Sequence, residues 1–368
     1  MMTPSTPTAF TQKRERHEAL FKQPFATPLM LSRLGVVVVA IVFVLSAYAD
    51  ARSQTLQSVK ERGAVACGVS QGVVGFSARS ANGEWAGIDA DFCRALAAAI
   101  FDDASKVRFL PLSADDRFQA LQSKQVDVLA RNSTWTISRE VDHGLAFVVV
   151  NFYDSQGLMV RRARNVASAL ELNASKICVQ SGTTTESNLE DYFAAYGIRY
   201  ERVAVSTVDE GLKAYEAGQC DVLTADASAL HGLRLRTAEP NAHDILRDVI
   251  SKEPLGPVVR QDDFQWFNIV KWTNFAMLNA EELGVNTHTL DDALSSAQPD
   301  LKRFVGTEGN FGERMGLTRD WAVRIVRRVG NYAEVYDRNI GARASLRIPR
   351  GINQLWINGG ILYAPPMR

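Results

Sequence analysis

Short apolar runs alternate with amphipathic stretches along most of the chain, a pattern that predicts an α/β fold. The spacing of Phe92, Leu96 and Ile100 predicts the buried face of a helix whose N-cap is Asp89. The other expected helices are 115–123, a segment that ends at 217, 264–280 and 321–329. The expected strands are 64–69, 107–110, 126–130, 176–180, 200–205 and the run after Asp221.

One stretch of this pattern occurs twice, as ALQSKQVDVL at 120–129 and as AYEAGQCDVL at 214–223. Alanine, glutamine, aspartate, valine and leucine recur at matching offsets. Each copy predicts the end of an amphipathic helix, a tight turn and a buried strand. A chain built from two such halves directs both strand ends at one crevice, which is where open α/β sheets bind ligands.

The residues after the first copy predict an anion site. Thr136 is expected to be a helix N-cap, which places Arg139 in the first helical turn. A cation is disfavoured at the positive end of a helix dipole unless an anion lies in front of it. The hydroxyls of Ser133 and Thr134, the first-turn N–H groups and the guanidinium together would hold a carboxylate.

The second copy is followed by Asp226, which heads another expected helix. Its side chain is either an ordinary N-cap or an anion that faces the crevice. In the second case one half supplies a cation and the other an anion. That pairing suits a zwitterion.

Two further loops supply candidates. Gly182, Thr183 and Thr184 precede a helix and expose N–H and hydroxyl donors, although an ordinary N-cap explains them as well. They lack the G-x-x-x-x-G-K-[ST] pattern of a nucleotide phosphate site, and no cofactor is expected. Phe76 is either a ligand wall or a core residue. The run 68–72 matches G-x-S-x-G, but no helix follows it, which argues against a hydrolase.

The N-terminal region predicts export. The apolar run 34–49 is short for a membrane span and suits a signal peptide, and Ala47-Tyr48-Ala49 forms a small-x-small cleavage site before Asp50. An uncleaved anchor is the alternative, which N-terminal sequencing distinguishes. The stretch before the run is long for a signal peptide, so Met30 is a second candidate start.

Charge and cysteine content agree with an exported protein. The 41 basic and 41 acidic residues balance, and the part after residue 49 has no basic block, so no nucleic-acid partner is expected. The 4 cysteines contain no C-x-x-C pair, and their spacing does not suit zinc, so no metal is expected. Cys67–Cys93 and Cys178–Cys220 are the favoured disulfides, because each pair falls within one half of the chain.

From residue 50 onwards the chain resembles the polar amino-acid-binding proteins of ABC transporters, and most of all their general L-amino-acid-binding type. The similarity is carried by CGVSQGVVGFSA, GIDADFCRALAAAIF, DVLARNSTWTISRE, ICVQSGTTTESNL, CDVLTADASAL, ISKEPLGPVVRQ and GGILYAPP. It implies a type II periplasmic-binding-protein fold of two α/β lobes, with two crossing hinge strands. The implied division is 50–150 for the first part of lobe 1, 151–248 for lobe 2, and 249–368 for the rest of lobe 1 with a C-terminal helical extension.

The resemblance also implies roles for particular residues. Its T-x-T-x-x-R element, which binds the α-carboxylate, falls on Thr134, Thr136 and Arg139, and the aspartate that receives the α-ammonium falls on Asp226. The glycine-threonine element falls on Gly182, Thr183 and Thr184, and Asn132 and Phe76 complete the expected site. The implied protein is a monomer in the periplasm that passes an L-amino acid to a membrane permease driven by an ATPase.

The sequence departs from narrow-specificity relatives in its pocket. The loop before Phe76 offers valines and the segment 111–117 has no aromatic residue, which favours a roomier pocket and a broad substrate range. Arg117 or Arg131 would favour acidic side chains. A dehydratase-like enzyme on the same scaffold and an anchored sensor domain are the remaining alternatives. The enzyme would need a general acid, and no additional acidic motif in the sequence indicates one.

Overall fold

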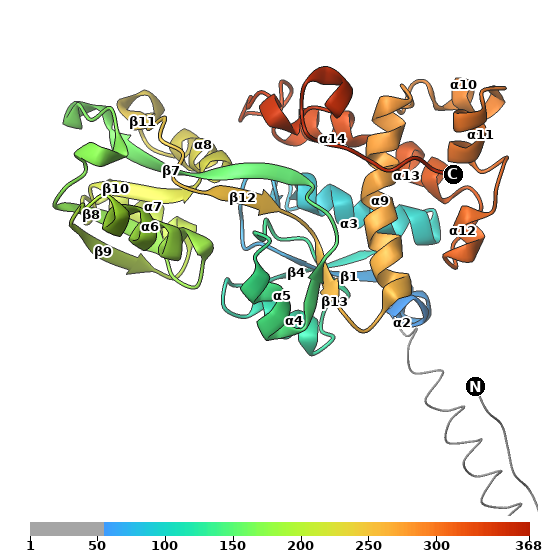
Figure 1. Cartoon of the computed structure of the whole chain (residues 1–368), viewed down its shortest axis with the longest axis horizontal. Coiled ribbons are helices and arrows are strands. Elements are labelled where there is room, and N and C mark those ends of the chain that lie inside the picture. The colour runs from blue at the N-terminus through green and yellow to red at the C-terminus, as the bar shows by residue number, and fades with distance from the viewer. Residues whose placement is uncertain (1–54) are drawn as a thin grey trace, which may run out of the picture. The chain divides into compact units, whose positions relative to one another are not determined.

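The computed structural model describes residues 55–368, which fold around two β-sheets (Figure 1). The first sheet has the order β4 (Val107–Pro111), β1 (Val65–Val69), β5 (Val128–Leu129), β13 (Val258–Arg260) and β6 (Leu145–Phe147). The second has the order β11 (His243–Ile245), β7 (Phe152–Arg161), β10 (Val222–Asp226), β8 (Ser175–Gln180) and β9 (Tyr200–Val205), with β12 (Lys252–Leu255) paired to β7. A short ribbon pairs β2 (Ala78–Arg79) with β3 (Trp85–Ala86).

Helices surround both sheets. The helices up to residue 235 are α2 (Thr55–Arg62), α3 (Ile88–Phe101), α4 (Arg117–Gln122), α5 (Ile137–His143), α6 (Thr184–Ala195), α7 (Val208–Glu216) and α8 (Ala227–Leu235). The last part contains α9 (Phe264–Glu282), α10 (Leu290–Ser295), α11 (Pro299–Val305), α12 (Phe311–Arg314), α13 (Trp321–Arg328) and α14 (Tyr332–Asn339). No helix within residues 55–368 combines the length and the apolar character that crossing a membrane requires.

Two antiparallel strands connect the lobes. β7 starts at the first lobe and continues into the second sheet, and β12 returns beside it with Leu255 opposite Phe152 and Glu253 opposite Asp154 (Figure 1). The two crossing hinge strands expected from the sequence are therefore confirmed. The exact lobe boundaries at 150/151 and 248/249 stay a prediction.

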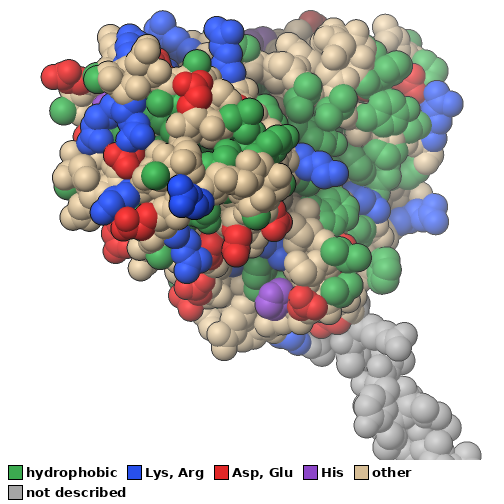
Figure 2. Space-filling view, turned by 60° about the vertical axis from the view of Figure 1, so that its left-hand side comes forward, with side chains coloured by type: hydrophobic (Ala, Val, Ile, Leu, Met, Phe, Trp, Pro, Cys, Tyr) green, Lys and Arg blue, Asp and Glu red, His purple; other side chains and the backbone are tan. Residues whose placement is uncertain are grey.

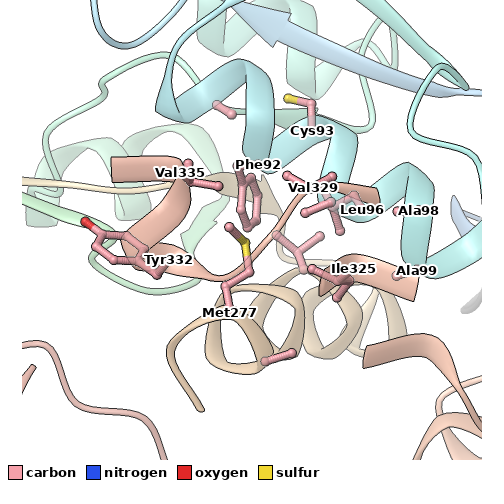
Figure 3. Packing of buried hydrophobic residues seen from close by; sticks show 14 of the residues in the cluster. Phe92, Cys93, Leu96, Ala98, Ala99, Met277, Ile325, Val329, Tyr332 and Val335 are labelled. Atoms are coloured by element: carbon pink, nitrogen blue, oxygen red, sulfur yellow. The ribbon is translucent and has the colours of Figure 1, made fainter. Parts of the chain in front are cut away.

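The C-terminal extension is part of the first lobe's core. The apolar face of α13, which includes Trp321 and Ile325, is buried against α3 and α9. Figure 3 shows side chains of α3, of α9 and of the segment that runs from α13 to α14 meeting at this contact, among them Phe92 and Met277. Arg327 and Arg328 of α13 are exposed. Figure 2 shows basic and acidic side chains interspersed over one face of the molecule.

The extension also reaches the hinge. The side chain of Asn353 accepts a hydrogen bond from the Tyr153 backbone N–H at 2.7 Å and donates one to the Tyr153 carbonyl at 2.9 Å. This side chain thereby satisfies the backbone of β7 as a neighbouring strand would. The hydroxyl of Tyr332 donates to the Asn151 carbonyl at 2.7 Å, directly before the hinge strand.

The sequence repeat is also a structural repeat. Both copies are a helix, a turn and a strand, α4 to β5 and α7 to β10, and both turns pass through the left-handed backbone region, at Lys124 and at Gly218. Asp127 and Asp221 occupy the same place in the two copies. Each accepts a hydrogen bond from a backbone N–H of the neighbouring strand, at 2.7 and 2.9 Å.

Both favoured disulfides are present. Cys67–Cys93 joins β1 to α3, and Cys178–Cys220 joins β8 to the turn before β10, with Cα–Cα distances of 6.3 and 5.7 Å. The expected N-cap at Asp89 is wrong, because the N-cap of α3 is Gly87, two residues earlier, and Asp89 lies in the first turn. The buried Asp89 carboxylate instead accepts a hydrogen bond from the Asn132 backbone N–H at 2.6 Å. The expected signal peptide, the cleavage before Asp50 and the choice of start residue lie outside the described residues.

Candidate functional site

The start of α5 has the arrangement that the sequence predicts. Thr136 is the N-cap, and its hydroxyl accepts a hydrogen bond from the Arg139 backbone N–H at 3.3 Å. The Arg139 side chain folds back over the helix start and donates to the Thr134 carbonyl at 2.6 Å. Although it carries a guanidinium, this side chain is only 9% exposed.

Arg117 and Arg131 join Arg139 to form a buried arginine cluster. Arg117 heads α4 and donates to the Gly182 carbonyl of the second lobe at 3.2 Å, while its Nε has no hydrogen-bond partner among the described residues. Burial, with repulsion from Arg131 and Arg139, lowers the pKa of Arg117 to about 8. Burial and repulsion from Arg139 lower the pKa of Arg131 to about 10. A buried guanidinium with an unmet donor, as at Arg117, is suited to an anion.

Three carboxyl groups face this cluster from the second lobe and the hinge, the buried Glu253 and the half-buried Asp154 and Asp226. Asp226 ends β10 and precedes α8, but its side chain makes no capping hydrogen bond with that helix. Asp154 and Glu253 lie opposite each other on β7 and β12. Burial, followed by repulsion from Asp154 and Glu253, raises the pKa of Asp226 well above its ordinary value. Burial raises the pKa of Asp154 to about 6. Such a cluster is suited to a cation.

The two lobes meet through the residues of the candidate site. Asn132 Nδ2 donates to Asp226 Oδ2 at 3.3 Å, while Asn132 Oδ1 has no partner among the described residues. The Thr134 and Thr184 hydroxyls lie 3.1 Å apart. Gly182 has a φ of 71°, a backbone conformation that favours glycine, and it lies close to the Asp115 side chain of lobe 1.

Two predicted site residues have other contacts. The Thr183 hydroxyl donates to the Gln180 carbonyl at 2.7 Å and so turns toward the preceding strand. Phe76 is 2% exposed, belongs to the core of the first lobe and packs edge-on against Phe152, with ring centroids 5.2 Å apart. A role for either residue in the ligand site stays a prediction.

Sequence reasoning missed Glu253 and Asp154. Glu253 is 1% exposed and accepts hydrogen bonds from residues of both lobes. Asp154 accepts from the hydroxyl and the backbone N–H of Ser228. The available signal for Glu253 was an acidic residue before a proline inside the segment expected to cross between the lobes.

The raised pKa of Asp154 predicts a pH effect on stability. A carboxyl whose pKa rises on folding contributes stability that is present below its unfolded pKa of 3.8 and is lost as the pH rises through its folded pKa of about 6. Asp154→Asn should therefore gain roughly 2 kcal/mol relative to the wild type between about pH 4 and about pH 7. Urea unfolding of both proteins across this range measures the difference. Parallel pH profiles would contradict the assignment.

Comparison with known proteins agrees with the fold. The general L-amino acid-binding periplasmic protein AapJ of Rhizobium johnstonii is 51% identical over 342 residues, which cover 92% of this chain and 99% of that protein. The glutamate/glutamine/aspartate/asparagine-binding protein BztA of Rhodobacter capsulatus is 47% identical, over 86% of this chain and 94% of that protein. A periplasmic binding protein from Brucella ovis, solved with glutathione bound, has 47% identity and a TM-score of 0.84, over 85% of this chain and 99% of that one.

Two α/β lobes joined by two hinge strands define a type II periplasmic-binding-protein fold, as the resemblance implied. The chain matches the bacterial extracellular solute-binding proteins, family 3, over residues 65–284. It belongs to that family. The C-terminal extension lies beyond the matched segment.

Proposed function

We propose that this protein captures L-amino acids in the periplasm, without chemical turnover, and delivers them as a monomer to the permease and ATPase of an ABC transporter. The observation that supports this most is the meeting of two clusters of opposite charge, the buried arginines of lobe 1 and the buried or half-buried carboxyls of lobe 2 and the hinge. The names of the relatives AapJ and BztA point in the same direction.

Opposite charges at the two sides of one cleft select for the common part of every amino acid. Arg139 serves the α-carboxylate, and Asp226 serves the α-ammonium through a charge-assisted bond. A ligand that contacts both lobes stabilises the closed form by the difference between its affinities for the closed and the open form. A compound with only one of the two charges leaves a buried partner unpaired, which is costly.

We also propose broad specificity with a preference for acidic side chains. The arginine cluster has more positive charge than one α-carboxylate uses, and the Nε of Arg117 is an unmet donor. A second carboxylate on the ligand would use it. Glutathione, which is bound in the Brucella ovis relative, is a second candidate because it has two carboxylates and an α-amino group.

Calorimetric titration with the protein amino acids and glutathione tests this specificity. We expect several amino acids to bind, with L-glutamate tighter than L-glutamine. Arg117→Met should reduce that preference by about tenfold, because it removes a charged hydrogen-bond donor. Arg162→Met is the matched control, since Arg162 is an exposed arginine that pairs with Asp244 on the second lobe. A single tight ligand would contradict the broad range, and an unchanged preference in Arg117→Met would contradict the role of that arginine.

A further inference from the structure

The C-terminal extension ends in a compact loop, the C-terminal loop, which comprises residues 351–364. Leu355 forms a parallel bridge with Leu362, and the Leu362 backbone N–H donates to the Gln354 carbonyl at 3.1 Å. A Cβ at Gly360 would stand 2.0 Å from the Gln354 carbonyl oxygen, so the chain closes here only through a glycine. Its own backbone contacts therefore order the loop.

The two faces of the C-terminal loop differ in burial. Successive residues of an extended segment point to opposite sides, and Leu355 and Leu362 are only 1% and 2% exposed. The residues that follow them, Trp356 and Tyr363, are 49% and 60% exposed, and their ring centroids lie 5.6 Å apart. Three exposed isoleucines of the same loop extend this apolar surface. The outward patch comprises Ile352, Trp356, Ile357, Ile361 and Tyr363.

The size of the outward patch indicates a transient partner. Its side chains, each about half exposed, present on the order of 500 Å² of apolar surface. A patch of this size is at the upper end of what a monomer exposes, and such patches are often functional. A standard stable interface buries about 800 Å² on each partner, so the patch alone is too small for a permanent dimer of two copies.

The charge beside the outward patch indicates the chemistry of that partner. The Trp356 indole N–H donates to Glu282 Oε1 at 3.3 Å, and within residues 55–368 Glu282 forms no ion pair. The neighbouring Arg350 is already paired with Glu281. A membrane surface attracts patches flanked by several basic residues, and its phosphates repel a carboxylate. A protein segment that is apolar and carries a basic residue opposite Glu282 matches both features.

We propose that the outward patch docks on the extracytoplasmic face of the transporter's permease. The proposal rests on the proposed function, because a permease is the partner that a binding protein meets and leaves in each transport cycle. The C-terminal loop is also tied to the hinge, since the Asn353 side chain makes two hydrogen bonds to the Tyr153 backbone of β7. It lies beyond the matched segment 65–284, so its contact adds to those that the two lobes make.

The test titrates the L-glutamate-saturated protein against the permease–ATPase complex in lipid nanodiscs and measures ATPase activity. Trp356→Ser and Ile361→Lys should each raise the concentration for half-maximal stimulation by about tenfold or more. The first removes an aromatic anchor, and the second brings an unpaired charge into an apolar contact. Phe264→Ser is the matched control and should behave as the wild type. Its ring is 77% exposed at the first residue of α9, whereas Glu282 is the last residue of that helix.

Calorimetry with L-glutamate accompanies each variant, and the affinity should stay at the wild-type value because the outward patch lies outside the candidate site. The two variants are independent, so one that fails to fold leaves the other as the test. Unchanged half-maximal stimulation would overturn the inference. Equal binding of the wild type to empty nanodiscs would assign the patch to lipid, and a wild-type dimer that the variants abolish in sedimentation would assign it to a second copy. Either result also overturns it.

A failure of the proposed function gives a different result. A wild type that binds no amino acid, or that does not stimulate the ATPase, rejects the proposed function. If the wild type does both and the variants stimulate equally well, only the role of the outward patch is rejected.

Discussion

Arg139→Ala is expected to abolish amino-acid binding while the protein stays folded. The guanidinium lies at the start of α5 and is 9% exposed, so the ligand carboxylate that it serves would be left buried without its charged partner. Removing one member of a buried ion pair costs roughly 3 kcal/mol or more, which corresponds to a loss of affinity of about a hundredfold or more. Calorimetric titration with L-glutamate measures the loss, and thermal unfolding monitored by circular dichroism checks the fold.

Arg139→Lys is the matched variant for this experiment. Lysine keeps the positive charge but lacks the planar fork that contacts a carboxylate with two parallel bonds. We expect an affinity between those of the wild type and the alanine variant. Affinity close to that of the wild type in Arg139→Ala would remove this residue from the site.

Asp226→Asn is expected to have opposite effects on binding and on stability. Binding should fall by about a hundredfold or more, because the ligand ammonium loses its charged partner inside the protein. The free energy of unfolding at neutral pH should rise, because burial and the neighbouring Asp154 and Glu253 disfavour the Asp226 carboxylate. Its side chain does not cap α8, so the replacement breaks no cap.

Calorimetry and urea unfolding of the same Asp226→Asn preparation measure the two effects. A variant that binds weakly because it is misfolded would lose stability as well, so the opposite signs identify a site residue. Retained affinity would contradict the role of Asp226 in binding the ammonium. Reduced stability at neutral pH would contradict the account of its environment.

Local patterns predicted the parts of the site that depend on neighbouring residues. The cap at Thr136 and the position of Arg139 follow from a few residues in a row, and the duplicated helix–turn–strand unit led to Asp226. Glu253 depends instead on the pairing of β12 with β7, which joins segments about a hundred residues apart. Nothing next to it in the sequence shows that register.

The contacts of Asp89 and Arg117 also depend on segments that are distant in the sequence. An aspartate before an apolar periodic stretch is a good N-cap by local rules. In the structure the Asp89 carboxylate instead accepts a hydrogen bond from the Asn132 backbone N–H, which is distant in the sequence. Arg117 was a candidate for the pocket from its place in the segment 111–117, but its contact with Gly182 of the other lobe depends on where α4 is placed. Contacts between lobes are not encoded in local periodicity.

The bond between Asn353 and Tyr153 restricts where the two lobes can rotate against each other. The lobe-1 end of β7 is held by the extension, and the lobe-1 end of β12 is held by Thr134, which bridges to Leu255. Any rotation has to be absorbed between these anchors and the second sheet, where Asp154 and Glu253 lie opposite each other. The expected pivot therefore lies at Asp154 and Glu253, and each rotation of the lobes changes the distances among the charges of the candidate site.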